Sequence, residues 1–439
     1  MTQSIHRARY ALAEPNRLLH NAAVQIAASG RISRIGTWKG PPANSKATIV
    51  DWGSAVILPG LVNAHTHLEL TSLCDRLTRF TSFTDWISQL IRQRQKWTRD
   101  QFASSARQGA RLSLASGTTL AGDITSSGVG WHAAADVSLR RVVFEEVISL
   151  SPDRSNEAVA QLDRLITEAS RNPLQIHAVS PHAPYSTSSE LYRQSSEYAK
   201  ARGMLLATHV AETVAELEFL QNGTGEFRDF LDHMGVLPAG WKPPRLGPIQ
   251  YLDSAGILGR SSLLIHCNYL DEDAIDRLKT SDTNVVYCPR SHAFFGHENH
   301  PIRRLLDSGI NVALGSDSLA SNHSLSMLEE MRFLFGKRKD LTPEEIFRAA
   351  TSSGARALHF GGVLGRLKRG YWADMAILEL PSGMSKSGIL GEILEGAGEC
   401  IATIVQGKIA WEKSVAGEGT FSDSVPVGGL RKGRISRQP

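Results

Sequence analysis

The chain has 439 residues, 41% of them hydrophobic and 21% charged, which excludes a disordered protein. Basic residues exceed acidic ones by only 48 − 44 = 4, too small an excess to indicate nucleic-acid binding. No apolar stretch approaches the roughly 18 residues of a membrane span, and residues 1–30 lack the apolar segment of a secretory signal. The four cysteines are too few and too widely spaced for a disulfide scaffold, so we expect a cytoplasmic protein.

Short strands are the first predicted elements. Between residues 20 and 58, glycines separate three β-type runs, which are Ala23–Ala27, Ala47–Asp51 and Ala55–Leu58. This pattern does not resemble the longer alternation that follows it. We therefore predict that residues 1–58 form part of a separate small β domain.

From residue 59 onward, short apolar runs alternate with helical patterns, which is typical of parallel βα units. Each run is almost wholly apolar, as expected for strands covered on both faces. The eight runs are Leu61–His65, Thr119–Asp123, Val142–Glu146, Ile176–Ser180, Leu205–His209, Leu263–His266, Val285–Cys288 and Val312–Gly315. They predict an α/β chain with a (β/α)₈ TIM barrel over residues 59–365. A doubly wound open sheet is the alternative, although no Gly-x-Gly-x-x-Gly turn follows any strand.

Two of the connections carry clear helix signals. Glu212–Leu220 has helical apolar spacing, with Gly223 as its C-cap. The sequence Thr342-Pro343-Glu344-Glu345 reads as an N-cap, a first-turn proline and a capping-box glutamate, and it predicts a helix to about Leu358. Residues 222–262 are the longest connection, and we expect them to cover a substrate.

After the barrel, strand patterns return. Asp374–Leu380 and Ile401–Trp411 are predicted strands, separated by glycines and a Pro-Ser-Gly turn. Strands at both chain ends can pair, so residues 1–58 and 366–425 are predicted to form one small β-sandwich domain. Residues 426–439 are rich in glycine, serine and arginine and are expected to form a loose tail.

Two histidines follow the first barrel strand in the sequence Asn63-Ala64-His65-Thr66-His67. Residues i and i+2 of an extended chain point to the same side, so both imidazoles can reach one metal ion. With 15 histidines in the chain, a His-x-His pair also arises by chance. The pair alone therefore leaves the metal hypothesis open.

Other strand ends favour a metal site. His209 and His266 close two apolar runs, and Asp317 follows a third. The carboxyl ends of barrel strands converge on one mouth, where catalytic groups sit. Histidines and an aspartate match the ligand preference of Zn²⁺. Any one of them is also compatible with a buried structural polar group, but we find none in a strand interior.

Glu212 lies three residues past His209, at the predicted start of a helix. Its simplest role is to stabilise the helix N-terminus. Beside a metal-activated water it can instead act as a proton shuttle, because one carboxylate can take the proton of the water and later protonate a leaving group.

Several motifs together resemble the amidohydrolase superfamily, most closely its cytosine/adenosine-deaminase-like and chlorohydrolase-like branch. They occur in the family's order and are Pro59–His67, Ser180–Tyr185, His209–Glu212, His266-Cys267, Cys288–Ser291, Gly315–Ser318 and Gly370–Asp374. The stretch His65–Leu70, with Ser186 after Tyr185, also resembles aminodeoxyfutalosine deaminases. S-adenosylhomocysteine deaminases are further candidate relatives.

The resemblance implies a role for individual residues. His65, His67, His209 and Asp317 would bind the metal, and Glu212 would shuttle protons. His266 would hold or polarise the attacking water, with Asp317 steadying it. His182 and Arg290 would contact the substrate, although His182 can also shape a turn and Arg290 can be a surface cation.

The family's binuclear members bridge two ions with a carboxylated lysine near strand 4. No lysine occurs between Lys96 and Lys200, so a single divalent ion is favoured, zinc before iron. Asparagine commonly follows Cys-Pro-Arg-Ser in this branch, whereas here His292 does, followed by Ala293-Phe294-Phe295. This departure predicts a reshaped substrate pocket.

The expected activity is hydrolytic deamination of a purine, nucleoside or related N-heterocycle. Phe83, Trp86, Phe294 and Phe295 are candidates for stacking on such a ring, or for the core. Triazine-type dechlorination is the enzymatic alternative, and a scaffold without a metal site is the non-enzymatic one. A nucleic-acid-binding protein is a third possibility, without a basic aromatic stripe to support it. We expect no membrane or nucleic-acid partner, and a homo-oligomer (a dimer).

Overall fold

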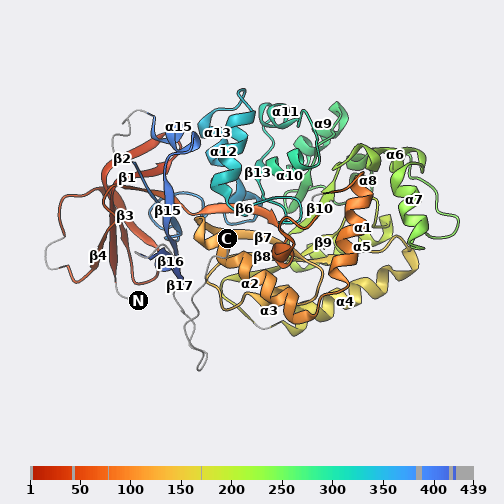
Figure 1. The fold of residues 1–439 in the computed structure, drawn as a ribbon, viewed down its shortest axis with the longest axis horizontal. Helices are drawn as coiled ribbons and strands as arrows, with labels where there is room; N and C mark the ends of the chain where they lie inside the picture. The colour runs from red at the N-terminus through yellow and green to blue at the C-terminus, as the bar shows by residue number, and fades with distance from the viewer. Residues whose placement is uncertain are drawn as a thin grey trace.

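Eight strands that are buried along nearly their whole length form a parallel barrel, which confirms the predicted fold (Figure 1). The computed structural model describes residues 3–41, 45–77, 79–169, 171–381, 388–414 and 419–421, and the predicted tail 426–439 lies outside them. In chain order the barrel strands are β6 (Leu61–Thr66), β7 (Thr118–Thr125), β8 (Arg140–Val147), β9 (Gln175–Pro181), β10 (Leu206–Val210), β11 (Ser262–His266), β12 (Asn284–Tyr287) and β13 (Val312–Leu314).

The first and last barrel strands meet and close the ring. The carbonyl oxygen of His65 accepts the amide N–H groups of Ser316 and Asp317, both at 3.1 Å, and Thr66 pairs with Asp317 in an isolated parallel bridge. Small and branched apolar side chains fill the interior, among them Val62, Ala178 and Ala313. The barrel is therefore a packed core with its functional side chains at one mouth.

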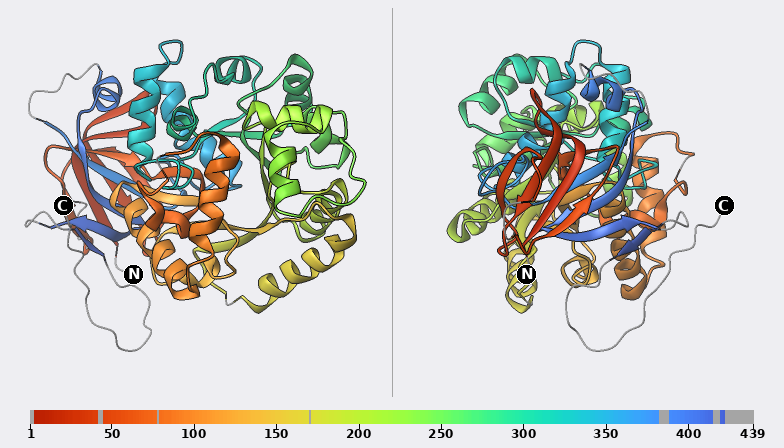
Figure 2. Two further views of the ribbon diagram at one scale, coloured as in Figure 1. Left: turned by 45° about the vertical axis from the view of Figure 1, so that its right-hand side comes forward. Right: turned by 90° about the vertical axis from the view of Figure 1, so that its left-hand side faces the viewer.

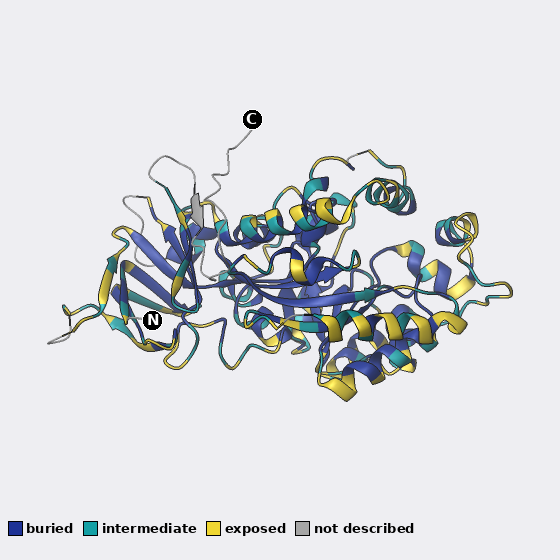
Figure 3. Cartoon of the chain, turned by 90° about the horizontal axis from the view of Figure 1, so that it is seen from below, coloured by how far each residue is buried: buried dark blue, intermediate teal, exposed yellow. Residues whose placement is uncertain are grey.

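Helices cover the outside of the barrel, with their outer faces exposed (Figure 3). They are α1 (Phe83–Arg94), α2 (Arg99–Ala115), α3 (Gly130–Ala133), α4 (Ser155–Glu168), α5 (Ser189–Arg202), α6 (Val214–Asn222), α7 (Glu226–His233), α8 (Pro248–Ser254), α9 (Glu272–Thr280), α10 (Pro289–Phe294), α11 (Ile302–Asp307), α12 (Met327–Lys337), α13 (Pro343–Ala349) and α14 (Ser352–Ala357). Short 3₁₀ helices η1 (Leu68–Leu73) and η2 (Pro152–Arg154) lie in two of the loops. Within the described part of the chain, no helix has the length and apolar composition needed to span a membrane.

Two predicted helices differ from the structure. The capping box at Thr342 is present, but the helix that it begins ends at Ala349, and a second helix starts at Ser352. The break arises because the carbonyl oxygen of Ala350 accepts the amide of Val62, at the start of the first barrel strand. Glu212 lies outside α6, which begins at Val214 behind the N-cap Thr213 and ends at the predicted cap Gly223.

Strands from both chain ends form one mixed sheet of nine strands, visible beside the barrel in Figure 2. They are β1 (Ser4–Glu14), β2 (Arg17–Ile26), β3 (Ile32–Thr37), β4 (Thr48–Asp51), β5 (Ala55–Pro59), β14 (Met375–Glu379), β15 (Glu399–Val405), β16 (Lys408–Lys413) and β17 (Gly419–Phe421). The two chain ends join where β14 pairs antiparallel with β5. Helix α15 (Ile389–Leu394) lies between β14 and β15.

The sheet curls around its own core, as the predicted sandwich requires. One apolar face, with Val24, Ile57 and Ile404 among its residues, forms a separate hydrophobic cluster. The turns at Gly30 and Gly407 touch, although they lie on strands far apart in the sheet order. Because β5 continues into β6, the sheet fixes the start of the strand that carries His65.

Candidate metal centre and active site

The predicted metal ligands converge at the barrel mouth. His65 and His67 come from the end of β6, His209 from β10, and Asp317 from the turn after β13. The Nε2 atoms of His67 and His209 are 3.3 Å apart, and Oδ1 of Asp317 is 3.4 Å from Nε2 of His65 and 3.8 Å from Nε2 of His67. Ligands about 2.0–2.1 Å from a tetrahedral zinc ion are about 3.3 Å apart. These spacings are those of side chains that can share a metal ion, and His65 belongs both to a group with His67 and Asp317 and to a group with His209 and His266.

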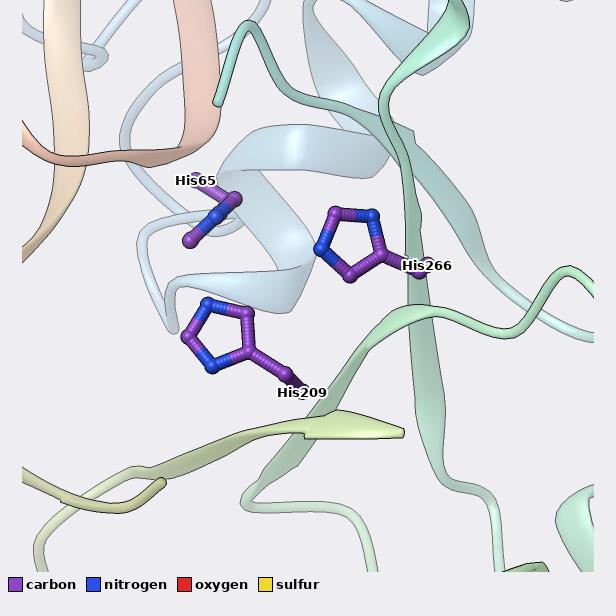
Figure 4. A group of neighbouring side chains, drawn as sticks. All are labelled: His65, His209 and His266. Atoms are coloured by element: carbon purple, nitrogen blue, oxygen red, sulfur yellow. The ribbon is translucent and has the colours of Figure 1, made fainter. Parts of the chain in front are cut away.

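His65 provides independent support for a metal. Its ring is fully buried, yet neither ring nitrogen has a hydrogen-bond partner among the described residues. Buried polar atoms are nearly always partnered. Figure 4 shows the rings of His65, His209 and His266 directed toward a common point. A metal ion at this point would use the unpartnered nitrogen of His65.

Neighbouring groups orient the ligands. His209 shares a hydrogen bond of 3.1 Å through Nδ1 with the carbonyl oxygen of His182, which makes Nδ1 the donor and leaves Nε2 free to bind a metal. The hydroxyls of Ser291 and Ser321 donate to Oδ2 of Asp317 at 2.7 and 2.8 Å. This leaves Oδ1 directed toward the histidines.

The backbone is strained at the same positions. Ala211, His266 and Asp317 have φ angles of 50°, 74° and 58°, in the left-handed region that non-glycine residues seldom adopt. Such strain clusters at functional sites, where the surrounding structure must compensate for it. Here it turns the chain sharply at the ends of three barrel strands, so that the side chains face inward.

Glu212 and His266 form a close pair beside the ligands. Oε1 of Glu212 is 3.3 Å from Nε2 of His266, and both side chains are buried. Burial, with the nearby charges of Asp317 and Glu216, raises the pKa of Glu212 well above its usual value. Burial lowers the pKa of His266 to about 3. The pair thus places a carboxyl whose raised pKa suits it to take up a proton beside a neutral imidazole.

A cavity of about 570 Å³ opens onto this centre, within the size range of small-molecule sites. Several of the predicted residues line it, namely His67, Trp86, His182, His209, Glu212, His266 and Asp317. Phe83 and Tyr185 add aromatic surface to the wall. His182 bonds through Nδ1 to Ser186 at 2.6 Å, and its Nε2 is 3.9 Å from Glu146.

Arg290 and Phe294 do not line this cavity. Both belong to α10, whose first residue is Pro289, and the amide of Arg290 donates to the buried carboxylate of Glu330 at 3.2 Å. Phe294 packs against Phe80 in a hydrophobic cluster next to the cavity wall. Neither residue therefore belongs to the wall from which the predicted substrate contacts would be made.

Sequence reasoning missed two carboxylates that organise the site. Glu216 accepts the backbone amides of Ala211 and Glu212. Buried Glu69 accepts hydrogen bonds from Arg94, which lines the cavity, and from the hydroxyl of Thr125. The four-residue spacing from Glu212 to Glu216 was the one available signal for the first. For the second we find no signal in the sequence.

Known proteins resemble the chain over most of its length. The Amidohydrolase family matches residues 56–410. A 5-methylthioadenosine/S-adenosylhomocysteine deaminase of Thermococcus onnurineus is 31% identical over 384 residues, 83% of this chain and 84% of that protein.

Two solved structures share the fold. The aminofutalosine deaminase of Helicobacter pylori, in complex with methylthio-coformycin, has a TM-score of 0.81 at 22% identity, covering 92% of this chain and 99% of that one. The atrazine chlorohydrolase of Arthrobacter aurescens, complexed with zinc, has a TM-score of 0.78 at 19% identity, covering 92% and 94%.

Proposed function

Because the chain belongs to the amidohydrolase family, we propose that it is a metal-dependent aminohydrolase. It replaces the amino group on an amidine-like carbon of an adenine nucleoside, purine or related N-heterocycle by oxygen and releases ammonia. The Glu212–His266 pair carries this proposal, since it places a proton carrier and a neutral imidazole against the ligand set at the closed end of a cavity. The relative from Thermococcus onnurineus, named for two adenine nucleosides, supports the substrate class.

His65, His67, His209 and Asp317 would hold one divalent ion, for which we propose zinc. Such an ion lowers the pKa of a water molecule so that the water can attack at neutral pH. Glu212 accepts the proton that the water loses and delivers it to the ring nitrogen next to the reacting carbon. His266, neutral because of its lowered pKa, hydrogen-bonds the attacking oxygen.

A second proton transfer through Glu212 expels the amino group. The tetrahedral carbon then carries a hydroxyl and an amino group. Glu212 takes the hydroxyl proton and gives it to the amino group, which leaves as ammonia while the carbonyl forms. Water and the amidine thus become a carbonyl and ammonia, and Glu212 returns to its starting state. Trp86 and Phe83, in the cavity wall, would hold the flat ring against the site.

The test is an ammonia-release screen over adenosine, 5′-methylthioadenosine, S-adenosylhomocysteine, aminodeoxyfutalosine, guanine and cytosine, combined with elemental analysis for zinc and iron. Chloride release from atrazine, measured in the same series, tests the chlorohydrolase alternative. The deaminase proposal requires ammonia from at least one of these rings. Chloride release without ammonia would reverse the order of the two candidates.

A variant separates the chemistry from the fold. Glu212→Gln should retain the metal and lose turnover by about 10²–10⁴-fold. Glu218→Gln, at an exposed position of the following helix, is the matched control and should keep both. Full activity in Glu212→Gln would remove Glu212 from the mechanism.

We further propose a cytoplasmic homodimer with a composite β domain of residues 1–58 and 366–425. The four cysteines, all free, support a reducing compartment. Light scattering of the purified protein measures the oligomeric state.

A further inference from the structure

Glu146 carries a buried carboxylate that no described residue meets with a hydrogen bond. It is the residue before last of β8 and lines the cavity, and its side chain is only 5% exposed. The nearest basic atom is Nε2 of His182 at 3.9 Å, which is beyond hydrogen-bond range. Burying a charged carboxylate is strongly unfavourable unless a cation or a hydrogen-bond donor meets it. The position of Glu146 therefore indicates a ligand.

His182 directs a second acceptor atom toward the same place. The hydroxyl of Ser186 donates to the carbonyl oxygen of Ala183 at 3.1 Å and shares a 2.6 Å hydrogen bond with Nδ1 of His182. Because a hydroxyl has only one hydrogen, Nδ1 is the donor in the second bond. The lone pair of the ring is then on Nε2, the atom nearest to Glu146. The imidazole and the carboxylate thus face each other as two acceptors.

His209 completes a group of three. One oxygen of Glu146 and one nitrogen each of His182 and His209 all lie within 4.8 Å of one another. The 3.9 Å between Glu146 and His182 is close to the 3.8 Å between Asp317 and His67 in the first ligand set. A carboxylate and two imidazoles are ligands that zinc uses, and three protein ligands leave a position open for water. This group has the composition of a zinc site.

The two ligand sets share His209. Its Nδ1 donates to the carbonyl oxygen of His182, so only the lone pair of Nε2 can bind a metal. An ion held by Glu146, His182 and His209 therefore takes a ligand away from the first ion. The first ion would keep the other three candidate ligands, which form a group within 4.8 Å by themselves.

We propose that Glu146, His182 and His209 form a second, weaker divalent-cation position that competes with the first ion for His209. It is weaker because it has three ligands and the first position has four, so it fills only in excess zinc. All three residues line the cavity together with Glu212. A second ion would thus occupy the space beside the proton shuttle and remove a ligand from the catalytic set, so that excess zinc inhibits. The inhibition rests on the proposed function, whereas the binding does not.

Counting bound zinc tests the second position. Metal-free protein is dialysed against increasing zinc sulfate, and the bound zinc is measured by elemental analysis. We expect one zinc per chain at low concentration and two at high concentration. Glu146→Gln should keep the first zinc and bind the second more than about 100-fold more weakly, since even the loss of an outer partner of a ligand costs roughly 10–100-fold. Glu145→Gln changes the preceding residue, which points to the other face of the strand and does not line the cavity, and should bind both.

Two further measurements accompany the count. An ion that binds only the folded protein stabilises it, so excess zinc should raise the thermal unfolding midpoint of wild type and Glu145→Gln, but not that of Glu146→Gln. The midpoints at one zinc per chain show whether each variant is folded. Ammonia release from the best substrate should fall in wild type as the second zinc binds, and should not fall in Glu146→Gln.

The outcomes separate this proposal from the proposed function. A single zinc in wild type at high concentration, or two in Glu146→Gln, would overturn the second position. Two zinc ions in wild type with undiminished ammonia release would overturn the competition for His209. If no ring releases ammonia, the deaminase proposal fails, and the zinc counts and midpoints still decide the second position.

Discussion

Glu216 holds the backbone of Glu212 in place. Its two carboxylate oxygens accept the amides of Ala211 and Glu212 at 3.0 and 2.9 Å. The carbonyl oxygen of Glu212 in turn accepts the side-chain amide of Asn268 at 2.9 Å. Because Ala211 has a strained φ of 50°, these contacts keep the turn in the one shape that points the Glu212 carboxyl at His266.

This relationship predicts the effect of Glu216→Gln. A glutamine can accept only one of the two amides and turns its own NH₂ toward the other, leaving a buried donor unpaired at a cost of about 1–3 kcal/mol. We expect a lower unfolding midpoint and a kcat reduced by about 10–100-fold, with KM and metal content near wild type. Glu218→Gln is again the control. A wild-type kcat would show that the turn holds its shape without Glu216.

Metal affinity should depend on Ser291 and Ser321. Their hydroxyls donate to Oδ2 of Asp317 and fix the orientation of its other oxygen. Removing such support from a ligand typically costs about 10–100-fold in affinity. Ser291→Ala and Ser321→Ala should each release the metal to a competing chelator at correspondingly lower chelator concentration. Ser33→Ala, on the remote strand β3, should behave like wild type.

Gly122→Ala should weaken metal binding, although Gly122 is not a candidate ligand. A Cβ at this position of β7 would lie 2.4 Å from the carbonyl oxygen of Ala64, the residue directly before the candidate ligand His65. The strand would have to move, at a cost of about 1–3 kcal/mol in stability. We expect a lower unfolding midpoint together with weaker metal binding. A variant that loses stability but keeps full metal affinity would contradict this coupling.

Stability should fall with rising pH because of Glu145. Burial, with the charges of Glu69 and Asp123, raises its pKa from 4.5 to about 8. A carboxyl whose pKa is higher in the folded state contributes its full stability below about pH 4.5 and loses it as the pH rises through about 8. Between about pH 6 and pH 9 the unfolding free energy should therefore fall in wild type and fall less in Glu145→Gln. Parallel pH curves for wild type and Glu145→Gln would disprove this. Glu157→Gln, at an exposed position, is the control and should follow the wild-type curve.

Much of the fold was predictable because a barrel strand is buried on both faces. This gave eight short apolar runs, and His209 and His266 stood out as the polar residues at which such runs stop. Closeness in space followed from topology alone, since all the strands end at one mouth. The resemblance to the family's motifs then distinguished the candidate ligands from the other histidines.

What the sequence did not reveal depends on tertiary hydrogen bonds and side-chain direction. The residues of α10 follow a strand end, as the candidate ligands do, but in that helix the backbone amide of Arg290 donates to Glu330 and Phe294 packs against Phe80. The predicted helix to Leu358 breaks because Ala350 bonds to Val62, a residue almost 300 positions earlier. Neither contact leaves a local pattern in the chain.

The seam of the barrel has a consequence for how the protein is made. His65 and Asp317 meet only where the first and last strands zip together, through the carbonyl oxygen of His65. A chain emerging from the ribosome therefore has its first two candidate ligands long before it has the last, and cannot assemble the complete set until the ring is shut. A metal bound by the complete set of candidate ligands would therefore be captured late, and it would link the first and last strands across that seam.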